Sequence, residues 1–227
     1  MIRNKSMEDN FKDVDIKNRT IVGIDVGTTN FFNCADEFLN EVFSYKSDKL
    51  PKLVRYYNDM ADEVRNNSKL SYKEQEQLMA KPKKYIEDYV EETIYNRIAD
   101  TIYYMFPPNS LFVIGDNSLN DSNVIWSANA LIIQTVNQTL KTYFKQSWHI
   151  QDKKVVGVEE RQTSITCPIC GNIDGDNRTI DNEFYCQSCH FTYDADDIVA
   201  SINIAQRYRK QNEVYQRLTN RLQVINY

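Results

Sequence analysis

Four cysteines in the last third of the chain stand in two C-x-x-C pairs, Cys167 with Cys170 and Cys186 with Cys189. Each pair aims two thiolates at one point, and two pairs separated by fifteen residues complete a tetrahedral shell of four sulfur ligands. In a reducing compartment such pairs are metal ligands rather than disulfides. The spacing predicts a structural zinc ion, because four thiolates leave no open position for chemistry. Redox-active dithiols are the minor alternative, and we expect His190 to be a surface residue.

Three acidic residues, Asp194, Asp196 and Asp197, follow the second cysteine pair and open a helix-like run from Ile198 to Tyr208. Asp is a favoured residue at a helix N-cap, and each of the three could occupy that position. One cap uses only one acid, so another is available for a different role. Asp197 is accordingly either a cap or the last ligand of a metal site, carried on the first turn of the closing helix.

Asp25 lies in a short apolar run over residues 20–26, which we interpret as a buried strand. A carboxylate in a buried strand is costly unless it is paired or bound to a metal ion. Asp25 is therefore either a first metal ligand or a strand-end residue that caps the turn formed by residues 27–29. The neighbouring residues leave both interpretations open.

A third acid is needed from the middle of the chain, and two residues compete for this position. Asp116 follows the apolar strand 111–114, although it also suits a turn. Glu160, or its neighbour Glu159, ends the next strand, where it could equally be a solvated surface acid. Three carboxylates from separate elements can hold two divalent cations about 3.5–4 Å apart. Hard oxygen ligands favour Mg²⁺ or Mn²⁺.

The elements that must position these acids alternate between strands and helices. An aliphatic residue recurs at intervals of four and predicts an amphipathic helix, which ends before two prolines at 107–108; the repeat consists of Ile86, Val90, Ile94, Ile98 and Ile102. The order of three strands, helix, strand, helix, strand, helix predicts an α/β fold with an antiparallel meander followed by parallel strands. This is the element order of the ribonuclease H-like fold. The predicted strands cover 20–26, 31–35, 41–45, 111–114 and 154–159, and the predicted helices cover 84–106, a stretch around 132–144 and 198–208.

The chain divides into a core interrupted by the cysteine segment. We expect a polar tail over 1–19, a core over 20–166, a zinc finger inserted at 167–189, a closing helix within 190–208 and a basic tail over 209–227.

Composition limits the class of protein. The 227 residues fit one domain with a small appendage, and 41 % hydrophobic residues suffice for a core. The net charge of −5 is unusual for a nucleic-acid-binding protein, which commonly presents a basic surface. The charge is uneven, however: residues 201–227 carry five Lys or Arg against one acid, whereas 172–197 carry seven acids against one Arg. We find no apolar run that could span a membrane and no signal peptide, and we expect a cytoplasmic protein.

Several segments resemble the RuvC-type nuclease domain of TnpB, a transposon-encoded RNA-guided nuclease, and of the related CRISPR type V effectors. The resemblance covers roughly residues 20–208. It implies a ribonuclease H-like (RuvC) core with an inserted four-cysteine zinc ribbon. Gly-Ile-Asp-Val-Gly at 23–27 is similar to the first motif, 160–171 resemble the Thr-Ser-x-x-Cys-x-x-Cys-Gly block, 184–189 match the second knuckle, and 197–204 are similar to the third motif.

The resemblance implies a Mg²⁺- or Mn²⁺-dependent DNA endonuclease whose two ions are held by Asp25, a middle acid and Asp197. The second motif of the family ends in Glu-Asp-Leu, where this chain has Gly-Asp-Asn at 115–117. Lineages with Gly-x-Asn at this point carry the glutamate elsewhere, which makes Glu160 a rival to Asp116. Val199 replaces an asparagine of the third motif.

Three classes of function remain open from the sequence. The N-terminal region with which TnpB holds its guide RNA has no counterpart in this sequence, so the expected partners are DNA, RNA and a separate protein subunit. The acidic net charge and the altered middle motif favour a second interpretation, a nuclease-inactive derivative that binds nucleic acid or a polymerase as a regulator. Residues 24–30 also resemble the first phosphate loop of actin-like and chaperone ATPases, but those proteins need two such subdomains and lack the finger.

Overall fold

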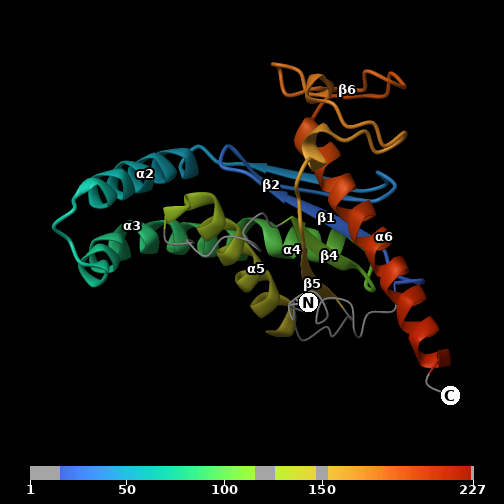
Figure 1. The fold of residues 1–227 in the computed structure, drawn as a ribbon, viewed down its shortest axis with the longest axis horizontal. Coiled ribbons are helices and arrows are strands. Elements are labelled where there is room, and N and C mark those ends of the chain that lie inside the picture. Colours follow the sequence, from blue (N-terminus) through green and yellow to red (C-terminus); the bar gives the residue numbers. More distant parts are fainter. Residues whose placement is uncertain (1–15, 116–125, 147–152, 226–227) are drawn as a thin grey trace.

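The computed structural model describes residues 16–115, 126–146 and 153–225, with side chains described as far as residue 217. A five-stranded sheet lies at its centre, and a small two-stranded ribbon lies at one end of the molecule (Figure 1). The five strands are β1 (Ile21–Val26), β2 (Asn30–Asp36), β3 (Val42–Lys46), β4 (Leu111–Gly115) and β5 (Lys154–Val158).

The strands follow the order β3-β2-β1-β4-β5 across the sheet. β1, β2 and β3 form the predicted antiparallel meander, and β4 and β5 extend the sheet parallel to β1. β1, β4 and β5 therefore run in one direction, and their carboxyl ends meet at the same edge of the sheet. This mixed sheet flanked by helices confirms the predicted fold class.

One face of the sheet packs against a helical layer. Alternate residues of β1 and β4, such as Val22, Ile24 and Phe112, lie in the core shared with this layer. The layer consists of α2 (Leu50–Asn66), α3 (Tyr72–Thr93), α4 (Ala99–Met105) and α5 (Ala128–Gln146). The helix predicted around residues 132–144 is present as α5, whereas α2 was not predicted.

The helix predicted over 84–106 is continuous with α3 but is not α-helical throughout. Residues Ile94–Ile98 form a π-helical segment, η1, between α3 and α4. An α-helix turns about 100° per residue, so side chains four residues apart drift by about 40° at each step. The wider π turn takes up much of this drift. The five aliphatic residues of the repeat, Ile86, Val90, Ile94, Ile98 and Ile102, consequently all remain buried on one side.

The opposite face of the sheet is crossed by the long helix α6 (Asp196–Ile225) (Figure 1). It includes the predicted helix 198–208 and continues through most of the predicted tail. Ile204, Ala205 and Tyr208 pack against β1, β4 and β5 on this face. Gly23 lets the helix approach β1 closely, because a Cβ at this position would overlap the carbonyl group of Ser201.

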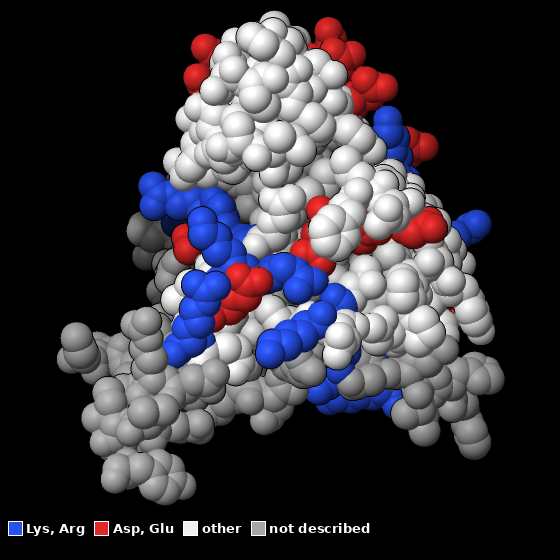
Figure 2. Space-filling view, turned by 90° about the vertical axis from the view of Figure 1, so that its right-hand side faces the viewer, with Lys and Arg blue, Asp and Glu red and all other residues white. Residues whose placement is uncertain are grey.

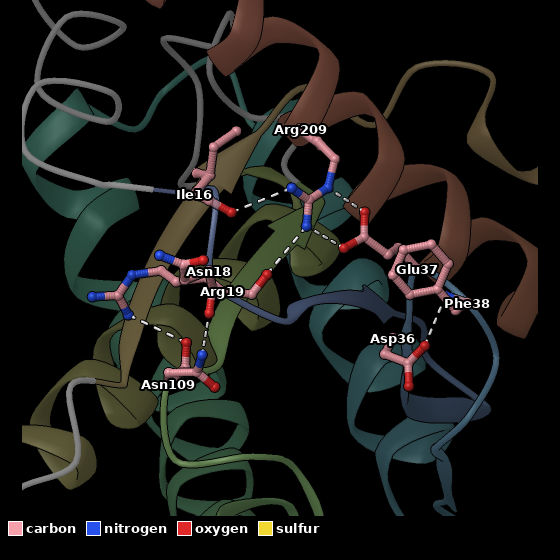
Figure 3. A network of polar contacts seen from close by, with 8 residues as sticks. All are labelled: Ile16, Asn18, Arg19, Asp36, Glu37, Phe38, Asn109 and Arg209. Atoms are coloured by element: carbon pink, nitrogen blue, oxygen red, sulfur yellow. Dashed lines mark hydrogen bonds and ion pairs between the residues drawn. The ribbon is translucent and has the colours of Figure 1, made fainter.

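Arg209 fastens the middle of α6 to the chain segments beside it (Figure 3). Two nitrogens of its guanidinium bind the buried carboxylate of Glu37, which directly follows β2. Arg209 also donates to the carbonyl oxygens of Ile16 at 3.3 Å and Arg19 at 3.1 Å. A fork of this kind matches carboxylate geometry and fixes orientation as well as contact. The helix therefore has a defined position over the sheet.

The cysteine segment forms a small lobe at the amino end of α6 (Figure 1). Its elements are the 3-10 turns η4 (Thr163–Ile165) and η5 (Gly175–Asn177) and the ribbon of β6 (Phe184–Tyr185) and β7 (Thr192–Tyr193). Its core joins Phe184 and two cysteines to Val199 of α6. Among the described residues, no helix has both the length and the apolar character required to cross a bilayer.

Candidate functional site

The geometry of α6 on β1 brings Asp25 and Asp197 together. Ile21, Gly23 and Asp25 point to the same side of β1, because side chains alternate along a strand. Gly23 lies against Ser201. From there, two residues along the strand cover about 6.6 Å and four residues along the helix cover about 6 Å. The two elements run antiparallel, so Asp25 and Asp197 arrive at the same place.

Asn30 orients the carboxylate of Asp197. Its side-chain amide donates to Asp197 Oδ2 at 2.5 Å. Asn30 opens β2 directly after the turn that follows Asp25, and Gly27 allows this turn to be tight, since a Cβ there would lie 2.7 Å from the Asn30 carbonyl oxygen. Ser201 extends the arrangement by donating to the backbone oxygens of Asn33 and Asp197, both at 3.0 Å. Sequence reasoning missed Asn30 because an asparagine after a turn has no distinctive pattern.

Glu160 reaches the same edge of the sheet from the end of β5. Val156 and Val158 face α6, and Glu160 continues this alternation two residues further. Its side chain lies over Gly115, the last residue of β4, where a Cβ would come within 2.9 Å of Glu160 Cβ and would also collide with its carboxylate. The glycine in the altered middle motif therefore makes room for the glutamate. Asp116, the other candidate for the middle acid, lies outside the described residues.

Two side chains of α6 hold the turn that carries Glu160. Asn203 donates to the carbonyl oxygens of Thr163 at 2.8 Å and Thr166 at 2.6 Å. Thr163 in turn donates through its hydroxyl group to the Glu160 carbonyl oxygen at 2.8 Å. Arg207 donates to the carbonyl oxygen of Glu159 at 2.7 Å. These contacts link the position of Glu160 to the helix that carries Asp197.

The electrostatics of Asp25 reflect this convergence of acids. Its pKa is raised well above the usual value, first by burial and then by the negative charges of Asp197, Glu160 and Asp196. The cation of Arg178 opposes the shift only weakly, as the last of the causes. A carboxyl group that carries a charge under these conditions is stabilised by a cation placed among the three acids.

Asp196 belongs to a different structural arrangement from its neighbour Asp197. Its side chain is 1 % exposed and forms an ion pair with Arg178 of the cysteine lobe. Its backbone N–H donates to the carbonyl oxygen of Asn182 at 2.9 Å. Burial and the charge of Asp197 raise the pKa of Asp196, and Arg178 lowers it. Asp196 therefore ties the start of α6 to the lobe, and Asp194 is exposed.

The carboxylates are less tightly clustered than the cysteine sulfur atoms. Among the described residues, the four cysteines are the one group of three or more Cys, His, Asp or Glu whose ligand atoms all lie within 4.8 Å. The acids Asp25, Glu160 and Asp197 are thus spread more widely than one coordination shell. A spread of this kind is compatible with two ions about 3.5–4 Å apart, which share their carboxylate ligands. The all-oxygen donor set also suits Mg²⁺ or Mn²⁺.

The four cysteine sulfur atoms form a compact cluster. Cys167 Sγ lies 3.5 Å from Cys189 Sγ, and Cys170 Sγ lies 3.6 Å from Cys186 Sγ. Sulfur atoms bound to zinc at about 2.3 Å in a tetrahedron are roughly 3.8 Å apart, so the spacing fits a zinc shell.

The two cysteine knuckles have matching backbone geometry. Gly171 and His190 each follow the second cysteine of a pair and have φ values of 76° and 61°. Their N–H groups donate to the carbonyl oxygens of Cys167 at 2.9 Å and Cys186 at 3.0 Å. His190 is exposed and its Nδ1 lies 2.8 Å from the hydroxyl of Tyr185, which fits the predicted surface role.

The surface around the lobe is divided by charge. Figure 2 shows the lobe with few Lys or Arg side chains, acids at its margins and a band of Lys and Arg below it. On α6, Arg207 and Lys210 line a cavity beside the cysteine segment. The net charge of the whole chain therefore conceals a locally basic face.

Comparison with known proteins supports a relationship to one family. Residues 138–204, which run from α5 through the cysteine lobe into α6, match the family model described as Cas12f1-like, TNB domain. No curated protein matches the chain in sequence.

Similar folds occur in two solved structures. A cryo-EM structure of a Cas12f1–sgRNA–target DNA complex has a TM-score of 0.51 and 18 % identity, over 82 % of this chain and 38 % of that one. A cryo-EM structure of a CRISPR-Cas12f ternary complex has a TM-score of 0.50 and 18 % identity, over 85 % of this chain and 40 % of that one. The chain thus spans about two fifths of the length of these proteins. The finger segment therefore resembles the TNB domain of Cas12f1-like proteins, and the chain shares its fold with the two Cas12f structures.

Proposed function

We propose that this chain is a RuvC-type, metal-dependent endonuclease that hydrolyses phosphodiester bonds in DNA. The observation that carries the proposal is the convergence of Asp25, Glu160 and Asp197, which raises the pKa of Asp25 through burial and mutual repulsion. In this proposal Glu160 is the middle acid, because it lies over Gly115 at the end of β4.

The acids would hold Mg²⁺ or Mn²⁺, and the bound ions would activate water and stabilise the leaving oxygen. Asp25 is buried and lies among the negative charges of Asp197, Glu160 and Asp196, which favours a place for it between the two ions. Asp197 binds from the first turn of α6 and is oriented by Asn30. Glu160 completes the set from the other side and is held in place through Thr163 and Asn203.

The cysteine cluster has a separate, structural role in this proposal. Cys167, Cys170, Cys186 and Cys189 would bind one zinc ion and leave it no open coordination position. The lobe then acts as a brace for the start of α6 through Arg178. Classical fingers of this size have little core of their own and depend on the metal for folding.

Nucleic acid is the expected partner. The solved Cas12f1 complex contains a guide RNA and target DNA, and we extend to this chain only the class of partner. Because the chain covers 38 % of that protein, cleavage of single-stranded or branched DNA, alone or with a separate subunit, is the activity to examine first.

The proposal is tested by incubating labelled single-stranded, double-stranded and branched DNA with Mg²⁺, Mn²⁺ or EDTA. Cleavage should require the divalent ion and should fall to background in Asp25→Ala, Glu160→Ala and Asp197→Ala. Asp181→Ala, which changes an exposed acid of the lobe, should cleave like the wild type. Asp116→Ala separates the two middle-acid candidates, because only the true ligand should be required. Full cleavage by the Asp25 and Asp197 variants would refute the site, and DNA binding without cleavage would favour the nuclease-inactive alternative.

A further inference from the structure

A polar cleft lies near the carboxylates, on the β3 side of the sheet. Its volume is about 620 Å³, and it lies between the β3–α2 connection and the π-helical segment η1. We call it the Lys46 cleft. Its principal polar residues are Lys46, Ser47, Lys49, Tyr89, Asn96 and Arg97.

The cleft is physically connected to the carboxylate site. Lys46 pairs with Asn30 across β2 and β3, and Asn30 is the residue that donates to Asp197. The backbone N–H of Ser47 donates to the carbonyl oxygen of Thr29 at 3.0 Å, in the turn that follows Asp25. The wall of the cleft formed by Ser47 is therefore hydrogen-bonded to the turn that follows Asp25.

The charges of the cleft suit an anion. Within the described part of the chain, Lys46, Lys49 and Arg97 form no ion pair. The ammonium of Lys49 lies 5.0 Å from the centre of the Tyr89 ring, which holds it at the cleft without neutralising it. Asp48 and Glu92 also line the cleft and limit its net positive charge. Cations without carboxylate partners are available for a phosphate.

Hydroxyl groups and backbone irregularities give the cleft a defined shape. Ser47 Oγ lies 2.8 Å from the hydroxyl of Tyr89 and accepts the N–H of Leu50 at 2.9 Å, at the start of α2. The π-helical segment forms one side of the cleft, and the pairing of β2 with β3, which precedes the other side, has a register shift between Asn30 and Phe32. Such interruptions are frequent beside functional sites.

We propose that the Lys46 cleft binds a backbone phosphate of the DNA strand whose scissile bond lies at the carboxylates. This inference rests on the proposed function for the identity of the strand. Lys46 and Arg97 contact the phosphate, and Lys49 with Tyr89 borders it. The contact fixes how the strand enters the site, which three repelling acids cannot do by themselves.

The test measures binding of a fluorescein-labelled single-stranded DNA by anisotropy in the Asp25→Asn background, at several salt concentrations. Lys46→Gln with Arg97→Gln should weaken binding about tenfold and reduce the salt slope by about 0.7 for each phosphate that the protein no longer neutralises. Glu92→Gln should strengthen binding, because it removes a negative charge from the cleft. A loss of folding would weaken DNA binding in every variant, so it cannot explain weaker binding in one variant and stronger binding in the other.

Lys81→Gln provides a matched control. Lys81 lies 5.7 Å from the Tyr85 ring centre, a contact of the same kind as that between Lys49 and Tyr89, but it precedes Tyr89 by about 12 Å along α3. Binding that is unchanged by the cleft variants, or weakened equally by Lys81→Gln, overturns the inference. Displacement of the strand by low-millimolar inorganic phosphate would also overturn it, since the cleft would then prefer a free ion. If the cleft variants lose binding while the protein with an intact Asp25 cuts no DNA, the cleft is supported and the nuclease is refuted.

Discussion

Glu160 can join the carboxylates because the residue at the end of β4 is a glycine. Any side chain at position 115 would occupy the volume of the Glu160 carboxylate. In the proposed site, Glu160, which lies 45 positions after Gly115, would compensate for the altered middle motif. Register in the parallel pair β4–β5 determines this exchange, and sequence alone does not specify register.

Asn30 gives a first prediction at the residue scale. Asn30→Ala removes the hydrogen bond to Asp197 but leaves the carboxylates in place. Loss of a residue that orients a metal ligand commonly lowers metal affinity or activity by about 10- to 100-fold, so we expect an effect of that size on cleavage. The Mg²⁺ concentration for half-maximal cleavage should rise. Asn40→Ala, at an exposed position, should leave both unchanged.

Asp25 gives a second prediction, which concerns stability and pH. Its folded-state pKa is raised, so the folded protein binds a proton more strongly than the unfolded chain above the ordinary carboxyl pKa. Stability without divalent ions should accordingly fall as the pH rises through that window. Asp25→Asn lacks this loss. We expect a higher melting temperature for Asp25→Asn than for wild type at pH 8 in EDTA, and a smaller gain on adding Mg²⁺.

Thermal unfolding at pH 5 and pH 8 measures both effects. The difference between Asp25→Asn and wild type should be larger at pH 8. An equal difference at the two pH values would show that the charge of Asp25 does not destabilise the folded protein. It would remove the main support for two metal ions at this site.

At the scale of elements, patterns of burial were predictable and contacts between elements were not. All five strands were predicted within two residues of their observed ends, because short apolar runs bounded by turn residues are distinctive. α2 was missed because its charged sequence obscures a sparse apolar face. The start of α3 carried an unused signal, the capping box of Ser71 and Glu74. The π segment could have been inferred from aliphatic residues spaced by four over five positions.

The candidate site divides in the same way. Asp25 and Asp197 were recognisable as candidates because Asp25 lies within an apolar run and Asp197 directly precedes one, each within a motif. The roles of Asn30, Ser201 and Asn203 depend on which residues of α6 face β1 and the turn after β5, and they appear only in the folded chain. Asp196 and Asp197 are adjacent and differ by about 100° in direction around the helix. Asp196 therefore faces Arg178 of the lobe, whereas Asp197 faces Asn30.

The contact between β1 and α6 gives a third prediction. Gly23→Ala places a methyl group against the Ser201 carbonyl, which must force the helix away from the strand. Overpacking of this kind costs about 1–3 kcal/mol of unfolding free energy. It should also separate Asp25 from Asp197 and reduce cleavage. Gly157→Ala is the control, because a Cβ there meets nothing within 4 Å. Equal stability of the two variants in urea unfolding would contradict the close approach.

At the scale of the whole molecule, the cysteine lobe and the carboxylate site form one connected unit. Arg178 and Asn182 of the lobe contact Asp196, and Asp196 adjoins Asp197. Val199 enters the core of the lobe, while Ile198 and Ile202 pack against Ala35 of β2. The first turns of α6 are therefore held by both the cysteine lobe and the sheet. Loss of the contacts with the lobe should make the carboxylate site less ordered.

Zinc removal tests this connection and gives a fourth prediction. Purified protein should contain about one zinc per chain. Removal by a chelator, or Cys186→Ser, should abolish cleavage although neither change touches a carboxylate. Hydrogen exchange should increase in residues 163–200 first, with β1 and β4 protected longer. The Arg178→Gln protein should retain its zinc and show a smaller increase in hydrogen exchange over the same residues. Full activity in zinc-free protein would show that the lobe is dispensable for the site.

The distribution of the three acids along the chain has a consequence for synthesis. Asp25 is made early, Glu160 late and Asp197 last, and the final acid is held in place only when α6 has been laid across the sheet. A nascent chain whose α6 is still in the ribosomal exit tunnel exposes Asp25 and Glu160 but neither Asp197 nor the α6 side chains Asn203 and Arg207, which hold the turn of Glu160. The enzyme that we propose would thus remain inert beside the nucleic acids of the translation machinery until α6 has emerged.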